Sequence, residues 1–127
     1  MEGTSLAGRS ILIVEDEPLI ALDIVYAFEK AGAVTFSART LAEAIDMVEH
    51  DGLSAAVLDF GLGDAHSEVI CKRLAERDIP FVLHSGHTHA SDACRGGAVV
   101  PKPAPADRLI TTIAGLLRRE SPEVACQ

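Results

Sequence analysis

Residues 10–16 read Ser-Ile-Leu-Ile-Val-Glu-Asp, an apolar run that stops at two adjacent carboxylates, Glu15 and Asp16. A short β-branched run of this kind predicts a buried strand over Ser10–Val14. The following stretch, Pro18–Gly32, has a helical period, and proline suits a first helical turn because its missing N–H would have no partner there. The segment therefore predicts a strand-helix unit with two carboxylates at the carboxyl end of the strand.

The same alternation of a short apolar run and a longer amphipathic segment recurs four more times along the chain. Further strands are predicted at Val34–Ser37, Ser54–Leu58, Ile79–His84 and Ala98–Val100. The helices that follow them are predicted at Leu41–Glu49, Ser67–Arg77, Ser91–Arg95 and Pro105–Arg119, the first of these capped by Thr40 with Glu43. Because strands that alternate with helices form parallel sheets, the sequence predicts one α/β domain of five strand-helix units.

Length and charge limit the domain organisation and the classes of partner. The 127 residues suffice for one domain, predicted over 10–119, with an N-terminal extension at 1–9, a C-terminal tail at 120–127 and no effector domain. The formal net charge of −8 repels nucleic acid and anionic lipid, so neither is expected as a partner. The three cysteines lack metal-type spacing and follow no apolar leader, which predicts reduced thiols and a cytoplasmic location.

Polar side chains follow four of the predicted strands. Glu15 and Asp16 follow the first strand, Asp59 the third, Ser85 the fourth and Lys102 the fifth. The carboxyl ends of parallel strands share one edge of the sheet, where open α/β sheets bind ligands. Carboxylates suit a hard divalent cation, and a hydroxyl and an ammonium suit phosphoryl oxygens. Each residue alone could be a helix-dipole, turn or surface charge, but together, in this order, they predict a phosphoryl-accepting site.

These positions also carry a family resemblance. The acidic pair, Asp59, Ser85 and Lys102-Pro103 resemble the receiver domain of two-component response regulators, and the similarity spans residues 10–119. Residues 80–87 resemble the Pro-Phe-x-Phe-Ala-Thr-Gly stretch of an alphaproteobacterial subgroup of stand-alone, single-domain receivers. The resemblance implies a flavodoxin-like (βα)5 fold with a doubly wound, five-stranded parallel sheet in the order 2-1-3-4-5. Only sixteen residues separate Ser85 from Lys102, which predicts a short fourth helix.

The resemblance implies that Asp59 accepts a phosphoryl group from a phosphohistidine on a sensor histidine kinase or a histidine phosphotransfer protein. It implies Mg²⁺ as the cofactor, with Mn²⁺ as an alternative. The implied ligands are Glu15, Asp16, Asp59 and the backbone carbonyl of Gly61. Carboxylates this close together repel one another unless a hard cation neutralises them, which supports the same ligand set.

Four further positions take their roles from the resemblance. Lys102 supplies a point charge for the phosphoryl oxygens, and Pro103, in a cis Lys-Pro peptide, aims it. Ser85 supplies a hydroxyl that moves toward the phosphoryl group and turns its charge into a change of surface. Val99 stands where many receivers carry a switch aromatic, so that part of the switch is expected to be missing.

The first helix is apolar on two sides. One stripe is predicted to face the core: Ile20, Ile24, Ala27, Phe28 and Ala31. The other stripe is predicted to be a partner surface beside the acidic site: Leu22, Val25 and Tyr26. Packing of this second stripe against the last helix is an equally supported alternative.

Three histidines, His84, His87 and His89, follow or end the fourth apolar run. A transition-metal site is less favoured here than packed or solvated roles, because histidines on a loop more often serve as polar groups than as ligands. Side chains alternate along a strand, so His84 is expected to point away from Ser85.

Three functions remain open from the sequence. The first is a stand-alone response regulator, a signalling domain rather than an enzyme, whose phosphorylation changes its binding to an unknown downstream protein. The second is a phosphate sink or relay intermediate. The third is a pseudo-receiver that binds partners without phosphorylation, which retention of the acidic, hydroxyl and lysine positions disfavours. An aspartyl phosphatase of the haloacid dehalogenase family would need a second acid at Gly61. A homodimer through the first or last helix is left open.

Overall fold

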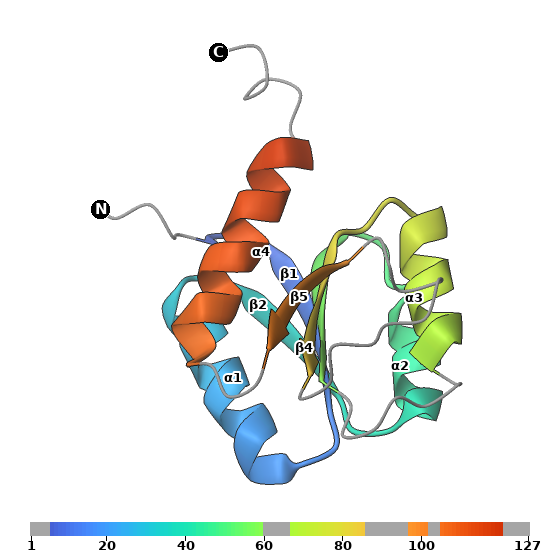
Figure 1. The fold of residues 1–127 in the computed structure, drawn as a ribbon, viewed down its shortest axis with the longest axis horizontal. Helices are drawn as coiled ribbons and strands as arrows, with labels where there is room; N and C mark the ends of the chain where they lie inside the picture. The colour runs from blue at the N-terminus through green and yellow to red at the C-terminus, as the bar shows by residue number, and fades with distance from the viewer. Residues whose placement is uncertain (1–5, 60–66, 86–96, 102–104, 121–127) are drawn as a thin grey trace.

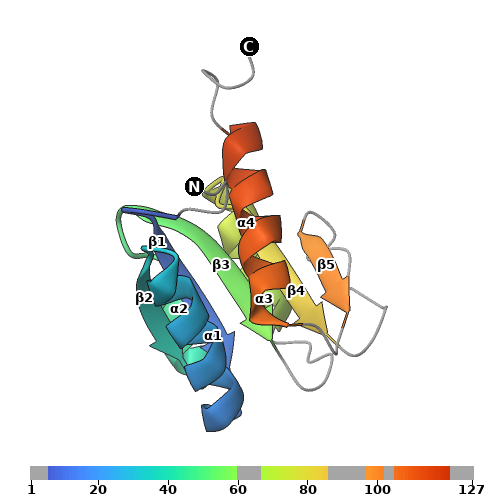
Figure 2. The ribbon, with the colours of Figure 1, turned by 90° about the vertical axis from the view of Figure 1, so that its left-hand side faces the viewer.

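The computed structural model describes residues 6–59, 67–85, 97–101 and 105–120. Along these residues the strands are β1 (Ser10–Glu15), β2 (Val34–Ala38), β3 (Leu53–Asp59), β4 (Phe81–Ser85) and β5 (Ala98–Pro101). The helices are α1 (Pro18–Lys30), α2 (Leu41–Met47), α3 (Ser67–Glu76) and α4 (Ala106–Glu120). The strands form one parallel sheet in the order β2-β1-β3-β4-β5, as Figure 2 shows from the side of α1 and α4. The predicted strand order and flavodoxin-like architecture are confirmed.

The helices cover both faces of the sheet, with α1 and α4 on one side and α2 and α3 on the other (Figure 1). We call these the α1/α4 face and the α2/α3 face. Side chains that the strands bury on the α1/α4 face are Ile11, Ile13, Ala55, Val57, Val82 and Val100. Those that they bury on the α2/α3 face are Leu12, Val14, Ala56, Leu58 and Phe81. Because both faces are covered, the strands are nearly continuous apolar runs, as parallel sheets require.

The helix α1 begins and ends where its sequence signals place it. Pro18 is the first helical residue and Glu17 the N-cap, whose own side chain makes no capping hydrogen bond. Gly32 follows the last turn with a φ of 97°. A Cβ at this position would lie 3.0 Å from the Cα of Ala7, so both the backbone angle and the close approach require glycine.

The core stripe of α1 is confirmed in its middle and wrong at its start. Ile24 and Phe28 are buried, and Ala27 and Ala31 pack against the same cluster. Ile20 is 39% exposed, because the first turn of α1 projects beyond the carboxyl end of the sheet (Figure 1). The helical period identified the correct face, but it does not tell where the sheet stops.

On the α2/α3 face, local hydrogen bonds and one ion pair fix the helices. The predicted capping box of α2 is confirmed: Thr40 Oγ1 accepts from the Glu43 N–H at 3.2 Å, and Glu43 Oε1 accepts from the Arg39 N–H at 2.8 Å. Arg73 of α3 donates to both carboxylate oxygens of Glu49, which follows α2. This hydrogen bond lowers the pKa of Glu49, but the pair is exposed and contributes little to stability.

One prediction about the cysteines is wrong, and one about the segment between β4 and β5 is not tested by the described residues. Cys71 is fully buried in α3, and it is disulfide-bonded. The prediction of a reduced thiol is therefore wrong at this position, because cysteine spacing along the chain does not show which sulfurs meet in space. Its partner cysteine and the predicted helix at Ser91–Arg95 lie outside the described residues. No helix in the described part of the chain is long and apolar enough to cross a membrane.

Candidate functional site

Two of the predicted acidic residues are brought side by side at the carboxyl edge of the sheet. Glu15 ends β1 and Asp59 ends β3, and the two are paired in register across these neighbouring strands. Glu15 is only 1% exposed, whereas Asp16, the next residue, is exposed. Neighbouring strands lie about 4.8 Å apart, so the backbones of these two acidic residues are adjacent at this edge. The strand β3 is longer than predicted by one residue at each end and includes Asp59 itself.

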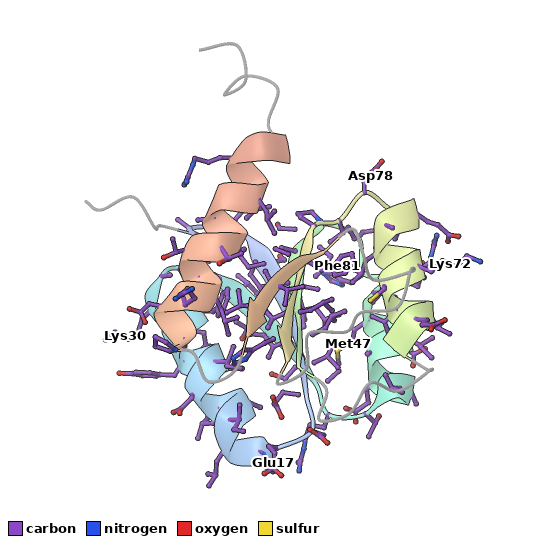
Figure 3. All side chains as sticks on the ribbon, viewed as in Figure 1. Glu17, Lys30, Met47, Lys72, Asp78 and Phe81 are labelled. Atoms are coloured by element: carbon purple, nitrogen blue, oxygen red, sulfur yellow. The ribbon has the colours of Figure 1, made fainter. Side chains whose placement is uncertain are left out.

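Glu15 also holds the start of α1. Its Oε2 accepts a hydrogen bond of 2.8 Å from the backbone N–H of Glu17, the N-cap residue. Figure 3 shows Glu17 at the end of the molecule where the strands point, and Asp78 at the opposite end, before β4. The buried side chain of Glu15 therefore links the acidic edge to the start of α1. Sequence reasoning assigned Glu15 to metal binding alone.

The other two strand ends lie at the same edge. Ser85 ends β4 and is paired in register with Pro101, the last residue of β5, so Lys102 follows directly in the chain. The side chains of Asp59 and Ser85, and residues 61 and 102–103, lie outside the described part of the structure. The roles predicted for Gly61, Lys102 and Pro103 therefore stay predictions.

The donor set fits a hard cation. Glu15, Asp16 and Asp59 carry carboxylates, which are the ligands that Mg²⁺ prefers, and the backbones of Glu15 and Asp59 are paired in register. Within the described side chains, no group of three or more His, Cys, Asp or Glu side chains is placed to hold a metal ion. Since the Asp59 side chain is not among these, the described set contains only part of the predicted site.

The position of the missing aromatic switch lies on the edge strand. Val99 of β5 is paired with Leu83 and is 47% exposed. Gly97, just before β5, lies against the ring of Phe81, where a Cβ would come within 2.4 Å of a ring carbon. Figure 3 shows Phe81 on the side of the sheet that faces α3. The residue before β5 thus packs against the ring of Phe81, while Val99 within the strand is exposed to solvent.

The predicted partner surface is partly exposed in the structure. Leu22 is 64% and Tyr26 63% exposed, and the Nζ of Lys30 lies 5.4 Å from the centre of the Tyr26 ring. Val25 is half-buried and packs against the cluster on the α1/α4 face. Sequence reasoning missed Leu19, which is 78% exposed. Its spacing of three residues before Leu22 was the available signal, since such positions share a helix face.

Sequence reasoning also gave no role to His84. This residue precedes Ser85 in β4 and is 6% exposed. The signal was a single histidine inside the apolar run of β4. Val82, two residues earlier, is buried on the α1/α4 face, while Leu83 packs on the α2/α3 face. The side chain of Ser85 lies outside the described structure, so the expected direction of His84 relative to Ser85 stays a prediction.

Comparison with known proteins gives one family. The family model described as the response regulator receiver domain matches residues 11–114. The sensor protein TorS of Escherichia coli is 25% identical over 92% of this chain and 14% of its own length. The response regulator MprA of Mycobacterium bovis is 27% identical over 92% of this chain and 54% of its own length. The chain thus spans about half, or less, of the curated relatives it matches.

A solved structure gives the same result for the fold. The response regulator protein TrrA from Thermotoga maritima, in complex with Mg²⁺-BeF, has a TM-score of 0.73. It is 18% identical, and the match covers 85% of this chain and 98% of that one. At this identity the likeness supports the architecture, and the chemistry has to be argued from the residues of the site.

Proposed function

Because the chain belongs to the response regulator receiver domain family, whose members are signalling domains of two-component systems, we propose that Asp59 accepts a phosphoryl group from a phosphohistidine of a partner kinase. One observation carries the proposal: Asp59 ends the central strand β3 in register with buried Glu15, beside the exposed carboxylate of Asp16. A nucleophilic carboxylate at an edge that can bind a cation is what phosphoryl transfer needs.

The transfer is a displacement at phosphorus. A carboxylate oxygen of Asp59 forms the new P–O bond, the P–N bond to the donor imidazole breaks, and the leaving nitrogen keeps the electron pair. Asp59 is held at the end of a strand paired on both sides, by β1 and β4, so its backbone is rigid. A rigid nucleophile reduces the entropy cost of alignment with the donor.

We assign Glu15, Asp16, Asp59 and the carbonyl of Gly61 to hold Mg²⁺, or Mn²⁺ in its place. When bound, the ion neutralises the acidic edge and the charge that develops on the transferred group. TrrA, which shares the fold, was solved with Mg²⁺-BeF, and this lends support to the assignment. If the assignment is right, removal of Mg²⁺ by EDTA should abolish phosphoryl uptake.

We assign three further positions at the same edge to the phosphorylated state. Lys102 provides an ammonium for the phosphoryl oxygens, and Pro103 sets its direction. Ser85 donates its hydroxyl to the phosphoryl group and conveys phosphorylation to the surface around the exposed Val99. Valine has no large ring to swing inward, so the surface change at this point is expected to be small.

Kinases and a downstream protein are the proposed partners, in the cytoplasm. TorS, a relative, is a sensor protein. We assign kinase contact to Leu22, Val25 and Tyr26, of which Leu22 and Tyr26 are exposed on α1. Leu22→Ser should slow phosphotransfer from a kinase but leave uptake from acetyl phosphate unchanged, because the small donor needs no docking surface. Equal slowing with both donors would remove this surface from the proposal.

The central test is the intact mass of the protein after incubation with Mg²⁺ and acetyl phosphate. Wild type should gain one phosphoryl mass, and Asp59→Asn should gain none while keeping the circular dichroism spectrum of the wild type. Asp23→Asn, a substitution of an exposed acid on α1, is the matched control and should be phosphorylated like wild type. Phosphorylation of Asp59→Asn at the wild-type level would show that another residue is the acceptor.

Phosphoryl uptake in this experiment separates a pseudo-receiver from the other two functions, and a measurement of partner binding with and without phosphorylation separates a response regulator from a phosphate sink. A phosphate sink or relay intermediate would take up the phosphoryl group and pass it to water or to a phosphotransfer histidine, without a change in partner binding. A pseudo-receiver would take up none from acetyl phosphate or from any kinase and would bind its partner regardless.

A further inference from the structure

The helices α1 and α2 begin in different ways. The start of α2 is capped from within, because Thr40 accepts from the N–H of Glu43 and Glu43 accepts from the N–H of Arg39. In the described structure, the side chain of Glu17, the N-cap residue of α1, makes no capping hydrogen bond, and the first turn of α1 carries no acidic residue. The side-chain hydrogen bond that holds the start of α1 comes instead from outside the helix.

That hydrogen bond comes from the strand β1. Oε2 of Glu15 accepts from the N–H of Glu17 at 2.8 Å. The carbonyl of Glu17 accepts from the N–H of Ala21 at 2.9 Å, which is the first hydrogen bond along the helix. The backbone of Glu15 is itself paired with that of Asp59 across β1 and β3. Glu17 is thus bonded to the end of the sheet on one side and to the helix on the other.

The residues that follow Glu17 carry exposed apolar side chains. Leu19 is 78% and Leu22 is 64% exposed, so packing against the sheet does little to hold them. Figure 3 shows Glu17 at the end of the molecule where α1 begins. A helix end with few buried contacts opens easily, and its order depends on the hydrogen bonds of its first turn. The order of Leu19 and Leu22 therefore depends on the carboxylate that anchors Glu17.

We propose that Glu15 is a positioning residue for α1: its buried carboxylate sets the start of the helix and couples the acidic edge to the exposed side chains of Leu19 and Leu22. The inference rests on the proposed function, in which the acidic edge binds Mg²⁺ and Leu22 contacts the kinase. An ionised carboxylate has about four acceptor sites on its two oxygens, so Glu15 can accept from Glu17 and contact a cation at the same time. A cation that immobilises this carboxylate also orders the first turn of α1, so the kinase meets a more ordered surface on the metal-bound protein.

The first test needs neither a metal ion nor a phosphoryl donor. Amide hydrogen exchange, measured by ¹⁵N NMR in EDTA, should show a protected N–H at Glu17 in wild type. Glu15→Met removes the acceptor at a similar side-chain length, and exchange at Glu17 and Ala21 should become about tenfold faster. Glu15→Gln keeps an oxygen acceptor and should restore most of the protection. An unprotected Glu17 N–H in wild type, or equal exchange in Glu15→Met and wild type, would overturn the proposal.

Glu43→Met is the matched control. Glu43 also accepts from a backbone N–H before a helix at 2.8 Å, but at the start of α2. Exchange in this variant should become faster at Arg39 and stay unchanged at Glu17. Equally fast exchange at Glu17 in Glu43→Met and Glu15→Met would indicate general loosening of the fold, and this result would count against a specific role of Glu15.

The second test adds Mg²⁺ alone to wild type. Exchange at Ala21 and Leu22 should become severalfold slower at saturating Mg²⁺, while exchange at Ala44, whose N–H donates to the carbonyl of Thr40 at the start of α2, stays unchanged. A melting temperature that rises with Mg²⁺ while exchange in α1 is unchanged would refute the coupling and leave the metal site intact. A melting temperature that does not rise would overturn the coupling together with the proposed Mg²⁺ site. Slower exchange in α1 without phosphoryl uptake would support the coupling and count against the phosphoacceptor role of Asp59 instead.

Discussion

The two faces of the sheet end differently, although the same strands build both. Toward the α2/α3 face the last inward residues are Val14 of β1 and Leu58 of β3, and both are buried in the apolar cluster. Toward the α1/α4 face the alternation of side chains places two buried polar residues, Glu15 at the end of β1 and His84 in β4. The α2/α3 face is therefore apolar to its end, whereas the α1/α4 face turns polar where the site lies.

The difference follows from the geometry of a strand, in which successive side chains point to opposite faces of the sheet. Residues that stabilise the apolar core and residues that carry the site can therefore alternate along one strand. A substitution of one residue changes one face, and its neighbour in sequence changes the other. The fold can keep a fully apolar layer under α2 and α3 while it tolerates buried polar groups under α1 and α4. Each of the following predictions tests how independent the two faces are.

The largest expected effect is on stability, and it should be similar on both faces. Phe28 on the α1/α4 side and Leu74 on the α2/α3 side are each fully buried. Phe28→Ala should lower the free energy of unfolding by about 3–5 kcal/mol and Leu74→Ala by about 2–5 kcal/mol, because each leaves a cavity. Urea denaturation measures both, with Tyr26→Ala as an exposed control on α1. A loss below about 1 kcal/mol on either side would mean that this face is not tightly packed.

A smaller effect is expected at the edge of the α2/α3 face. Gly97→Ala would bring a methyl group to 2.4 Å from the Phe81 ring, and this crowding should cost about 1–3 kcal/mol. A double-mutant cycle with Phe81→Leu should recover part of the loss, because the shorter side chain makes room. Strict additivity of the two substitutions would show that the ring is not what excludes a side chain at Gly97.

The smallest expected effect on stability comes from the polar end of the α1/α4 face. Glu15→Gln keeps a side-chain oxygen for the N–H of Glu17 but removes a charge beside Asp59. Without divalent cations the substitution should therefore change the melting temperature little or raise it. Saturating Mg²⁺ should raise the melting temperature of wild type more than that of Glu15→Gln, because a ligand stabilises the state that binds it. An equal rise in both proteins would exclude Glu15 from the metal site.

Much of the fold was predictable because it depends on local signals that repeat. Apolar runs, the proline at Pro18, the capping box at Thr40 and the glycine at Gly32 each act within a few residues, and the structure shows all of them where the sequence predicts them. The two wrong predictions concern contacts between residues that are far apart in the sequence. Ile20 has the correct helical phase but extends past the sheet, and the disulfide of Cys71 depends on a contact that spacing does not reveal.

For the site, the sequence predicted which polar residues lie at the ends of the strands but not the further contacts of these residues. The order of polar residues after apolar runs identified Glu15 and Asp59, and the register then made them neighbours. The same pattern could not reveal that Glu15 also accepts from the Glu17 N–H, nor that His84 is buried in the strand that neighbours β3. Both depend on which strands are adjacent, and that is a property of the whole sheet.

The place of β1 between β2 and β3 has a consequence for the assembly of the acidic edge. All three of these strands come from residues 10–59, in the N-terminal half of the chain. The backbone pairing of Glu15 with Asp59 therefore uses only this half, and β4 and β5 extend the sheet from the other side of β3.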